Sequence, residues 1–177
     1  DIAAETGWDN IILVGFRRES NMRFENKSVA QIAATLCKRP DDTALDLIAD
    51  EELHLAAIFH EIDENDVMKV MSHPLASIGS DGEAEAPYGP SGKSATHPRA
   101  YGAFPRVIRR YVIEKGLFSL EEAIRKMTSW PAERIGLFDR GVLARGMAAD
   151  VVIFDPEKIR DMATFEDSHR YPEGITS

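Results

Sequence analysis

The 177 residues of this chain carry a formal net charge of −9, and 44% of them are hydrophobic. That hydrophobic content is ordinary for a folded globular protein, and the acidic balance argues against a surface for nucleic acid or anionic membranes. Because Cys37 is the only cysteine, no intrachain disulfide can form, which fits a reducing, cytoplasmic compartment. The sequence contains neither an apolar stretch of about 18 residues nor a signal-peptide pattern.

The first third of the sequence alternates short apolar runs with helical patterns. Residues 11–16 and 55–62 are apolar runs of strand length. Between them, Ser28 can cap a helix whose apolar residues recur at helical spacing, and Pro40 suits the start of a second helix. Asp63 can cap the next helix along the chain. The acidic run 50–52 is interpreted as a solvated helix end.

A short apolar run then leads to a carboxylate between small residues. Residues 75–78 are predicted to form a buried strand that ends at Asp81. The glycine at position 82 lets the backbone turn sharply and lets a ligand come close. In α/β barrels the catalytic groups stand at the carboxyl ends of the strands. Residues 83–96 are rich in Gly, Pro and Ser and are interpreted as a mobile cover over this acid.

The second half of the sequence is mainly helical until it reaches its last third. A helix is predicted from Pro105 to about residue 115, and Ser119 with Glu122 has the spacing of a capping box for another. A further short helix is predicted after residue 129. Residues 141–155 combine glycine turns with a β-branched run, so they predict a small β element.

Several segments of the chain resemble one known family. The clearest are residues 79–82 (GSDG) and residues 97–106 (HPRAYGAFPR). They resemble motifs of the D-aminoacylase (N-acyl-D-amino-acid deacylase) family, within the amidohydrolase superfamily. The resemblance covers nearly the whole chain and is strongest over residues 78–175. It extends to four later segments: residues 120–129, 131–134, 145–155 and 165–175.

The resemblance implies an α/β fold, namely the C-terminal part of a metal-dependent TIM-like (β/α)8 barrel hydrolase. This part would be mostly helical with a few strands, and would include part of a small β-domain. Residues 1–62 would be an insertion before the last barrel strand. Residues 63–135 would hold that strand and its flanking helices, and residues 136–177 part of the β-domain and the tail. We therefore expect a C-terminal fragment of a longer enzyme.

The implied reaction is zinc-dependent hydrolysis of the amide bond of N-acyl-D-amino acids, giving a carboxylate and a free D-amino acid. Asp81 is the implied catalytic proton acceptor and a possible metal ligand. Arg99 would bind the substrate carboxylate, because its planar guanidinium can donate two parallel hydrogen bonds. Tyr101, Ser80 and Gly82 are the other implied substrate-binding residues.

The metal ligands of such an enzyme are mostly absent from this sequence. A zinc site needs three or four converging nitrogen, oxygen or sulfur ligands. The five histidines form no His-x-His and no His-x-x-x-His pattern. We therefore expect the 177 residues alone to bind no zinc and to be inactive, with zinc held by the intact enzyme.

Two alternatives stay open. The chain could belong to an amidohydrolase of cyclic amides, such as a dihydroorotase or hydantoinase, although residues 97–106 argue against that class. It could instead be a non-catalytic helical module, a homo-oligomer that covers its exposed core. In that case Asp81 is an ordinary turn residue and Arg99 a surface ion-pair partner. The substrate side-chain preference is not determined by these residues.

Overall fold

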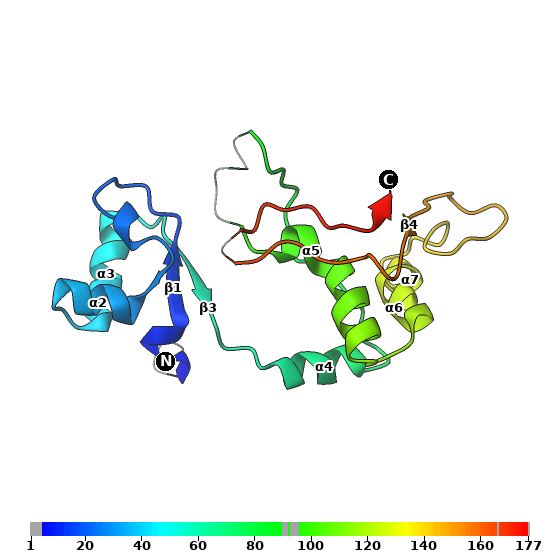
Figure 1. The fold of residues 1–177 in the computed structure, drawn as a ribbon, viewed down its shortest axis with the longest axis horizontal. Helices are drawn as coiled ribbons and strands as arrows, with labels where there is room; N and C mark the ends of the chain where they lie inside the picture. Colours follow the sequence, from blue (N-terminus) through cyan, green and yellow to red (C-terminus); the bar gives the residue numbers. More distant parts are fainter. Residues whose placement is uncertain (1–4, 90–91, 93–95, 166, 177) are drawn as a thin grey trace. The chain divides into compact units, whose positions relative to one another are not determined.

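The computed structural model describes residues 5–89, 92, 96–165 and 167–176, and the chain divides into two compact units (Figure 1). The first unit ends at Asp63 and the second begins at Glu64. No helix among the described residues has the length and apolar character needed to cross a bilayer.

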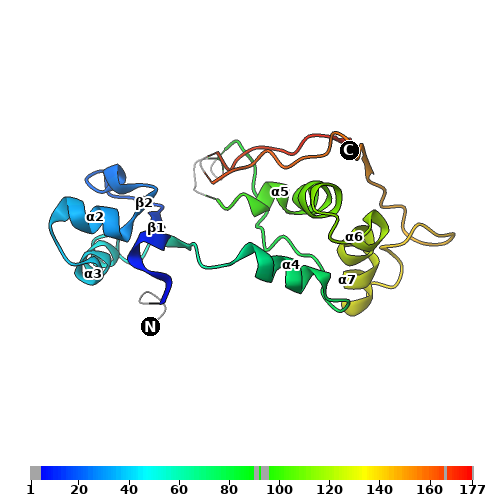
Figure 2. The same ribbon diagram turned by 60° about the horizontal axis from the view of Figure 1, so that its bottom comes forward.

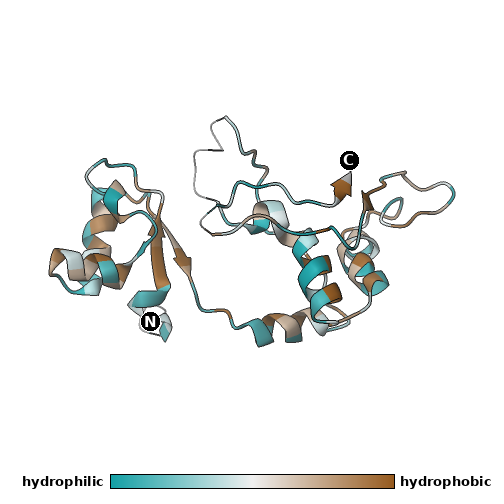
Figure 3. Ribbon diagram, viewed as in Figure 1, coloured by the Kyte–Doolittle hydropathy of each residue, from teal (hydrophilic) through white to brown (hydrophobic). Residues whose placement is uncertain are grey.

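The first unit is a small antiparallel sheet packed against two helices. Its strands are β1 (Ile11–Val14), β2 (Lys27–Ser28) and β3 (Ala56–Phe59), in the order β2-β1-β3. Ile12 pairs with Ser28 on one side and with Ile58 on the other. Two short 3₁₀ helices, η1 (Trp8–Asn10) and η2 (Met22–Phe24), complete the unit. The predicted strands over 11–16 and 55–62 are confirmed, and both strands are apolar in Figure 3.

The helices α2 (Val29–Leu36) and α3 (Pro40–Asp50) lie side by side in both views (Figures 1 and 2). The predicted cap of α2 is confirmed, because the Ser28 hydroxyl accepts a hydrogen bond from the Gln31 N–H at 3.2 Å. The Gln31 side chain in turn accepts from the Ser28 N–H at 3.0 Å. This reciprocal capping box fixes the start of the helix. The buried core beneath it contains Ile11, Leu13, Phe16, Phe24, Val29, Ile32 and Leu47.

The second unit is helical, with one short β ladder. Its elements are α4 (Glu64–Ser72), α5 (Arg99–Arg106), the π-helical η4 (Val107–Glu114), α6 (Leu120–Met127) and α7 (Ser129–Arg134). Val107, Tyr111 and Ala123 form the centre of its core. The strands β4 (Ile153–Phe154) and β5 (Ile175–Thr176) pair antiparallel, so the predicted β element in 141–155 is confined to two residues.

Two elements of the second unit differ from the sequence predictions. The helix predicted from Pro105 begins six residues earlier, at Arg99, and Pro105 lies inside it. Proline is compatible with a first turn but does not require one, and the wider π-helical turns begin at Val107, just after the missing N–H. The predicted buried strand at 75–78 is irregular backbone, because a strand needs a hydrogen-bonded neighbour and the described residues supply none there. It is not buried either, since Leu75 is 63% exposed.

Glu51 is a buried carboxylate that joins α3 to the loop after β1. It is 3% exposed and follows the last residue of α3. Its carboxylate accepts hydrogen bonds from the N–H groups of Arg17 (2.8 Å) and Arg18 (3.2 Å), and from the Asn21 amide (2.8 Å). Burial alone would raise the pKa of Glu51, but these hydrogen bonds outweigh it and leave the pKa below its usual value. The interpretation of residues 50–52 as a solvated helix end is therefore wrong for Glu51.

We predict that Glu51→Gln lowers the free energy of unfolding by about 1–3 kcal/mol at neutral pH, because buried donors lose an ionised acceptor. A depressed folded-state pKa stabilises the fold above the unfolded pKa of about 4.3, and this contribution is lost as the pH falls through the folded pKa. The difference in free energy of unfolding between the wild type and Glu51→Gln should therefore decrease as the pH falls. Urea denaturation followed by circular dichroism across this pH range measures it.

The matched control is Glu52→Gln, because the Glu52 side chain is 79% exposed and reaches Arg18 only at 3.8 Å. Its effect should stay within about 0.5 kcal/mol. Equal free energies of unfolding for the two variants at neutral pH would show that the buried Glu51 carboxylate does not stabilise the fold.

Candidate functional site

The turn that carries Asp81 lies against the start of α5. One Arg99 guanidinium nitrogen (Nη2) is 2.8 Å from Asp81 Oδ2, and Arg99 Nε donates to the Asp81 carbonyl oxygen at 3.2 Å. Two of the predicted site residues, 18 positions apart in the sequence, are therefore in direct contact.

The backbone around Asp81 explains this approach. Asp81 adopts a left-handed conformation with φ 48°, which costs an ordinary residue energy but is more common for Asp and Asn. The next N–H, that of Gly82, donates to the Ser80 hydroxyl at 3.2 Å. A Cβ on Gly82 would lie 2.8 Å from the Ala100 Cα, so only glycine lets the turn pack this closely on α5. Ser80 and Gly82 thus shape the turn.

The residues before α5 fix its first turn. Pro98 occupies the N-cap position, and His97 Nδ1 accepts a hydrogen bond from the Arg99 N–H at 3.1 Å. The His97 ring also stands edge-on to Phe165, with 5.0 Å between the ring centroids. His97 therefore orients the backbone of Arg99.

Tyr101 lies two residues after Arg99 in α5, and its side chain contacts residues near the end of the sequence. A hydrogen bond of 3.1 Å joins its hydroxyl to His169 Nδ1, and its ring packs edge-on to Tyr171 at 5.6 Å. Burial, reinforced by the nearby Glu85 carboxylate, raises the pKa of the Tyr101 hydroxyl. The sequence did not single out His169 as a site residue, although it lies in the last segment that resembles the deacylases.

Asp81 and Arg99 are both open to solvent. The Asp81 side chain is 84% exposed and the Arg99 side chain 45% exposed. An exposed ion pair contributes about 0–1 kcal/mol, so a competing carboxylate can open it cheaply. The pair therefore places a group that can accept a proton, the Asp81 carboxylate, beside a guanidinium that can bind another carboxylate.

The described residues do not by themselves form a metal site. Nowhere among them do three His, Cys, Asp or Glu side chains come together closely enough to hold an ion. Asp81 is the only predicted ligand in this region, and one carboxylate does not make a zinc site. Residues 90, 91 and 93–95 of the predicted mobile cover lie outside the described residues.

Comparison with known proteins identifies the family. A model of the amidohydrolase family matches residues 29–177. This chain belongs to the amidohydrolase family. Among curated relatives, a D-aminoacylase of Alcaligenes xylosoxydans xylosoxydans is 43% identical over 123 residues, which are 68% of this chain and 24% of the relative. The amidohydrolase chain thus spans about a quarter of that relative's length.

A solved structure is similar over almost the whole amidohydrolase chain. It is an N-acyl-D-glutamate deacylase of Bordetella bronchiseptica, in complex with zinc and a phosphonate inhibitor that mimics the tetrahedral intermediate. The TM-score is 0.82 at 34% identity, covering 98% of this chain and 34% of that one. A dihydroorotase of Lactobacillus acidophilus matches a shorter stretch, with 35% identity over 75 residues, 42% of this chain and 17% of that relative. The resemblance to D-aminoacylases is confirmed.

We predict that Gly82→Ala lowers the free energy of unfolding of the second unit by about 1–3 kcal/mol, because the added methyl group meets the α5 backbone. Gly79→Ala is the matched control, since a Cβ there meets nothing within 4 Å. Its stability should change by no more than about 0.5 kcal/mol. Thermal denaturation of both variants tests the close approach of Gly82 to the α5 backbone. Equal melting temperatures for the two variants would contradict it.

Proposed function

We propose that this chain is the C-terminal part of an enzyme that hydrolyses the amide bond of N-acyl-D-amino acids. The observation that carries the proposal is the contact between Asp81 and Arg99, because it brings a proton acceptor to a group that binds carboxylates. The similar solved structure is a deacylase of this kind, which supports the same reaction.

Asp81 acts as the general base and then as the general acid. Its carboxylate accepts a proton from the water that attacks the amide carbonyl carbon. The same proton passes to the nitrogen as the C–N bond breaks, and Asp81 is ionised again. The products are a carboxylate and a free D-amino acid.

Arg99 binds the α-carboxylate of the substrate. In the absence of substrate its Nη2 pairs with the Asp81 carboxylate, while its Nε is held by the Asp81 carbonyl oxygen. A substrate carboxylate can replace the Asp81 side chain on the guanidinium, because the exchange substitutes one charge-assisted hydrogen bond for another. Binding then releases the Asp81 carboxylate for proton transfer. Tyr101, Ser80 and Gly82 remain the predicted neighbours of the bound substrate.

The rest of the enzyme completes the site in this proposal. A TIM-like barrel would supply the metal site, and zinc is the proposed metal because the Bordetella relative was solved with it. The described residues do not form a zinc site without further ligands, so Asp81 is the only group of this chain that we expect to contribute. Residues 1–62 are then the insertion before the last strand, residues 63–135 the segment that bears Asp81, and residues 136–177 part of the small β-domain.

We predict that Asp81→Asn in the intact enzyme lowers kcat for an N-acetyl-D-amino acid by about 10²- to 10⁴-fold, because an amide keeps the shape but cannot take the proton. Asp139→Asn is the matched control, since Asp139 also pairs with an arginine, Arg140, at an exposed position. The control should keep normal turnover. Retention of more than half of kcat by Asp81→Asn would disprove the assignment, and hydrolysis of a cyclic amide alone would favour the dihydroorotase class.

We predict that Arg99→Lys lowers kcat/KM about 10- to 100-fold, because lysine keeps the charge but loses the planar pair of donors. Arg99→Met should lower it further. An N-acyl amine without the carboxylate should be insensitive to both changes. The same loss on this truncated substrate would mean that Arg99 holds structure and does not bind substrate, and Arg140→Lys controls for removal of an exposed arginine.

A further inference from the structure

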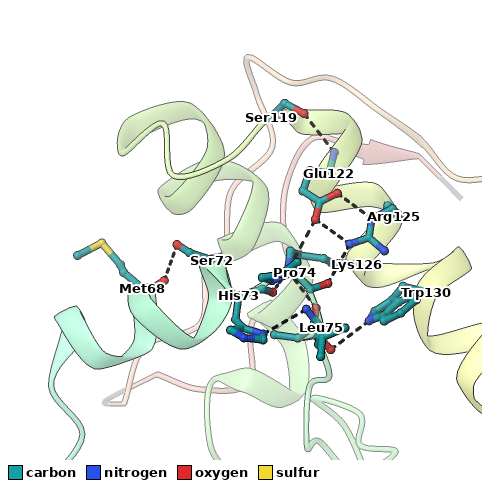
Figure 4. A network of polar contacts seen from close by, with 11 residues as sticks. Met68, Ser72, His73, Pro74, Leu75, Ser119, Glu122, Arg125, Lys126 and Trp130 are labelled. Carbon is teal, nitrogen blue, oxygen red and sulfur yellow. Dashed lines mark hydrogen bonds and ion pairs between the residues drawn. The ribbon is translucent and has the colours of Figure 1, made fainter.

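The segment that leads into Asp81 is held by the helices α6 and α7. Residues 73–78 follow the end of α4, and their backbone has no strand partner among the described residues. Figure 4 shows side chains of α6 and α7 pointing into this segment. The buried side chain among them is Lys126, near the end of α6, which is 1% exposed.

The Lys126 ammonium binds backbone oxygens. Its Nζ donates to the His73 carbonyl at 2.6 Å and to the Ala76 carbonyl at 3.1 Å (Figure 4). A Glu122 carboxylate oxygen lies further away, at 3.7 Å. Glu122 itself is engaged by Arg125 through two hydrogen bonds of 2.7 and 2.8 Å. The lysine charge is thus directed mainly at the backbone that follows α4, where the helix dipole favours a cation.

Three further hydrogen bonds tie the same segment down. The Ile78 N–H donates to the Lys126 carbonyl at 3.0 Å. The Trp130 indole donates to the Leu75 carbonyl at 3.2 Å, and Arg125 donates to the Pro74 carbonyl at 3.3 Å. Side-chain donors and one backbone acceptor of α6 and α7 therefore hydrogen-bond the backbone of 73–78, which has no strand partner among the described residues.

The anchored segment ends three residues before Asp81. Only Gly79 and Ser80 separate Ile78 from the acid, and Gly79 has open space around it. Because only these two residues intervene, a displacement of residues 73–78 would shift the start of the turn that carries Asp81. Misplacing a catalytic group by about 1 Å can cost about 100-fold in rate.

We propose that Lys126 is a positioning residue for proton transfer, acting through the backbone of 73–78 on the Asp81 carboxylate. The inference rests on the proposed function of Asp81. Lys126 does not touch the reacting groups, and its ammonium sets the position from which Asp81 reaches the attacking water.

The test uses Lys126→Met in the intact enzyme, which keeps much of the side-chain length and removes the donor. We expect kcat to fall about 10- to 100-fold while KM stays within about twofold, because the substrate carboxylate is bound by Arg99. Lys158→Met is the control, since the Lys158 side chain is 76% exposed. It should leave both constants unchanged.

A second variant covers the case in which Lys126→Met does not fold. Trp130→Phe keeps an aromatic ring beside the Arg125 and Arg134 guanidinium groups but removes the donor to Leu75, so kcat should fall about fivefold at constant KM. An unchanged kcat in Trp130→Phe, or in a folded Lys126→Met, would overturn the inference.

The double variant with Asp81→Asn separates positioning from a general loss of folded enzyme. If Lys126 acts through Asp81, adding Lys126→Met to Asp81→Asn lowers kcat by less than about twofold. A full additional loss would show that Lys126 has only a structural role. If Asp81→Asn alone keeps its turnover, the proposed function of Asp81 fails together with this inference; if Asp81→Asn is inactive and Lys126→Met is normal, only the inference fails.

Discussion

In both units of the chain, a buried charged side chain hydrogen-bonds backbone groups that lie outside helices and strands. In the first unit, the Glu51 carboxylate accepts the N–H groups of the loop after β1. In the second, the Lys126 ammonium donates to carbonyl groups that follow α4. The buried carboxylate accepts hydrogen bonds from backbone N–H groups, and the buried ammonium donates hydrogen bonds to backbone carbonyl groups.

Charged side chains are costly to bury, so a buried one indicates that its hydrogen bonds offset the cost. An ammonium or carboxylate removed from water loses several kcal/mol of solvation, and only charge-assisted hydrogen bonds of good geometry offset this loss. Both groups have short contacts, at 2.6 Å for Lys126 and 2.8 Å for Glu51. Each therefore holds an irregular segment in one conformation, and in the second unit that segment leads to the candidate proton acceptor.

The candidate site has a different physical character from its support. Asp81 and Arg99 form an exposed pair of low energetic value, whereas the segment behind them is held by hydrogen bonds from Lys126, whose side chain is buried. A rigid support with an easily opened ion pair suits a site that must exchange one carboxylate for another. The amidohydrolase family gives this arrangement its chemical meaning, and the deacylase reaction remains the proposal that the Asp81–Arg99 contact supports.

Local patterns in the sequence determined much of the secondary structure. Ser28 caps α2 as predicted, because a cap depends on residues only three positions apart. Ser119 also caps α6 by accepting from the Glu122 N–H, but the Glu122 side chain binds Arg125 and does not complete the predicted capping box. The family resemblance, and Asp81 with Arg99 as candidate residues, were also readable from contiguous motifs.

Tertiary structure decided which charged side chains are buried and which segments pair. Glu51 and Lys126 lie in sequence contexts typical of solvated helix ends, and they are buried only because distant segments pack over them. The apolar run at 75–78 has the composition of a strand, but strand formation requires a neighbour that composition cannot provide. The approach of His169 to Tyr101 likewise depends on the path of 68 intervening residues, which no local rule specifies.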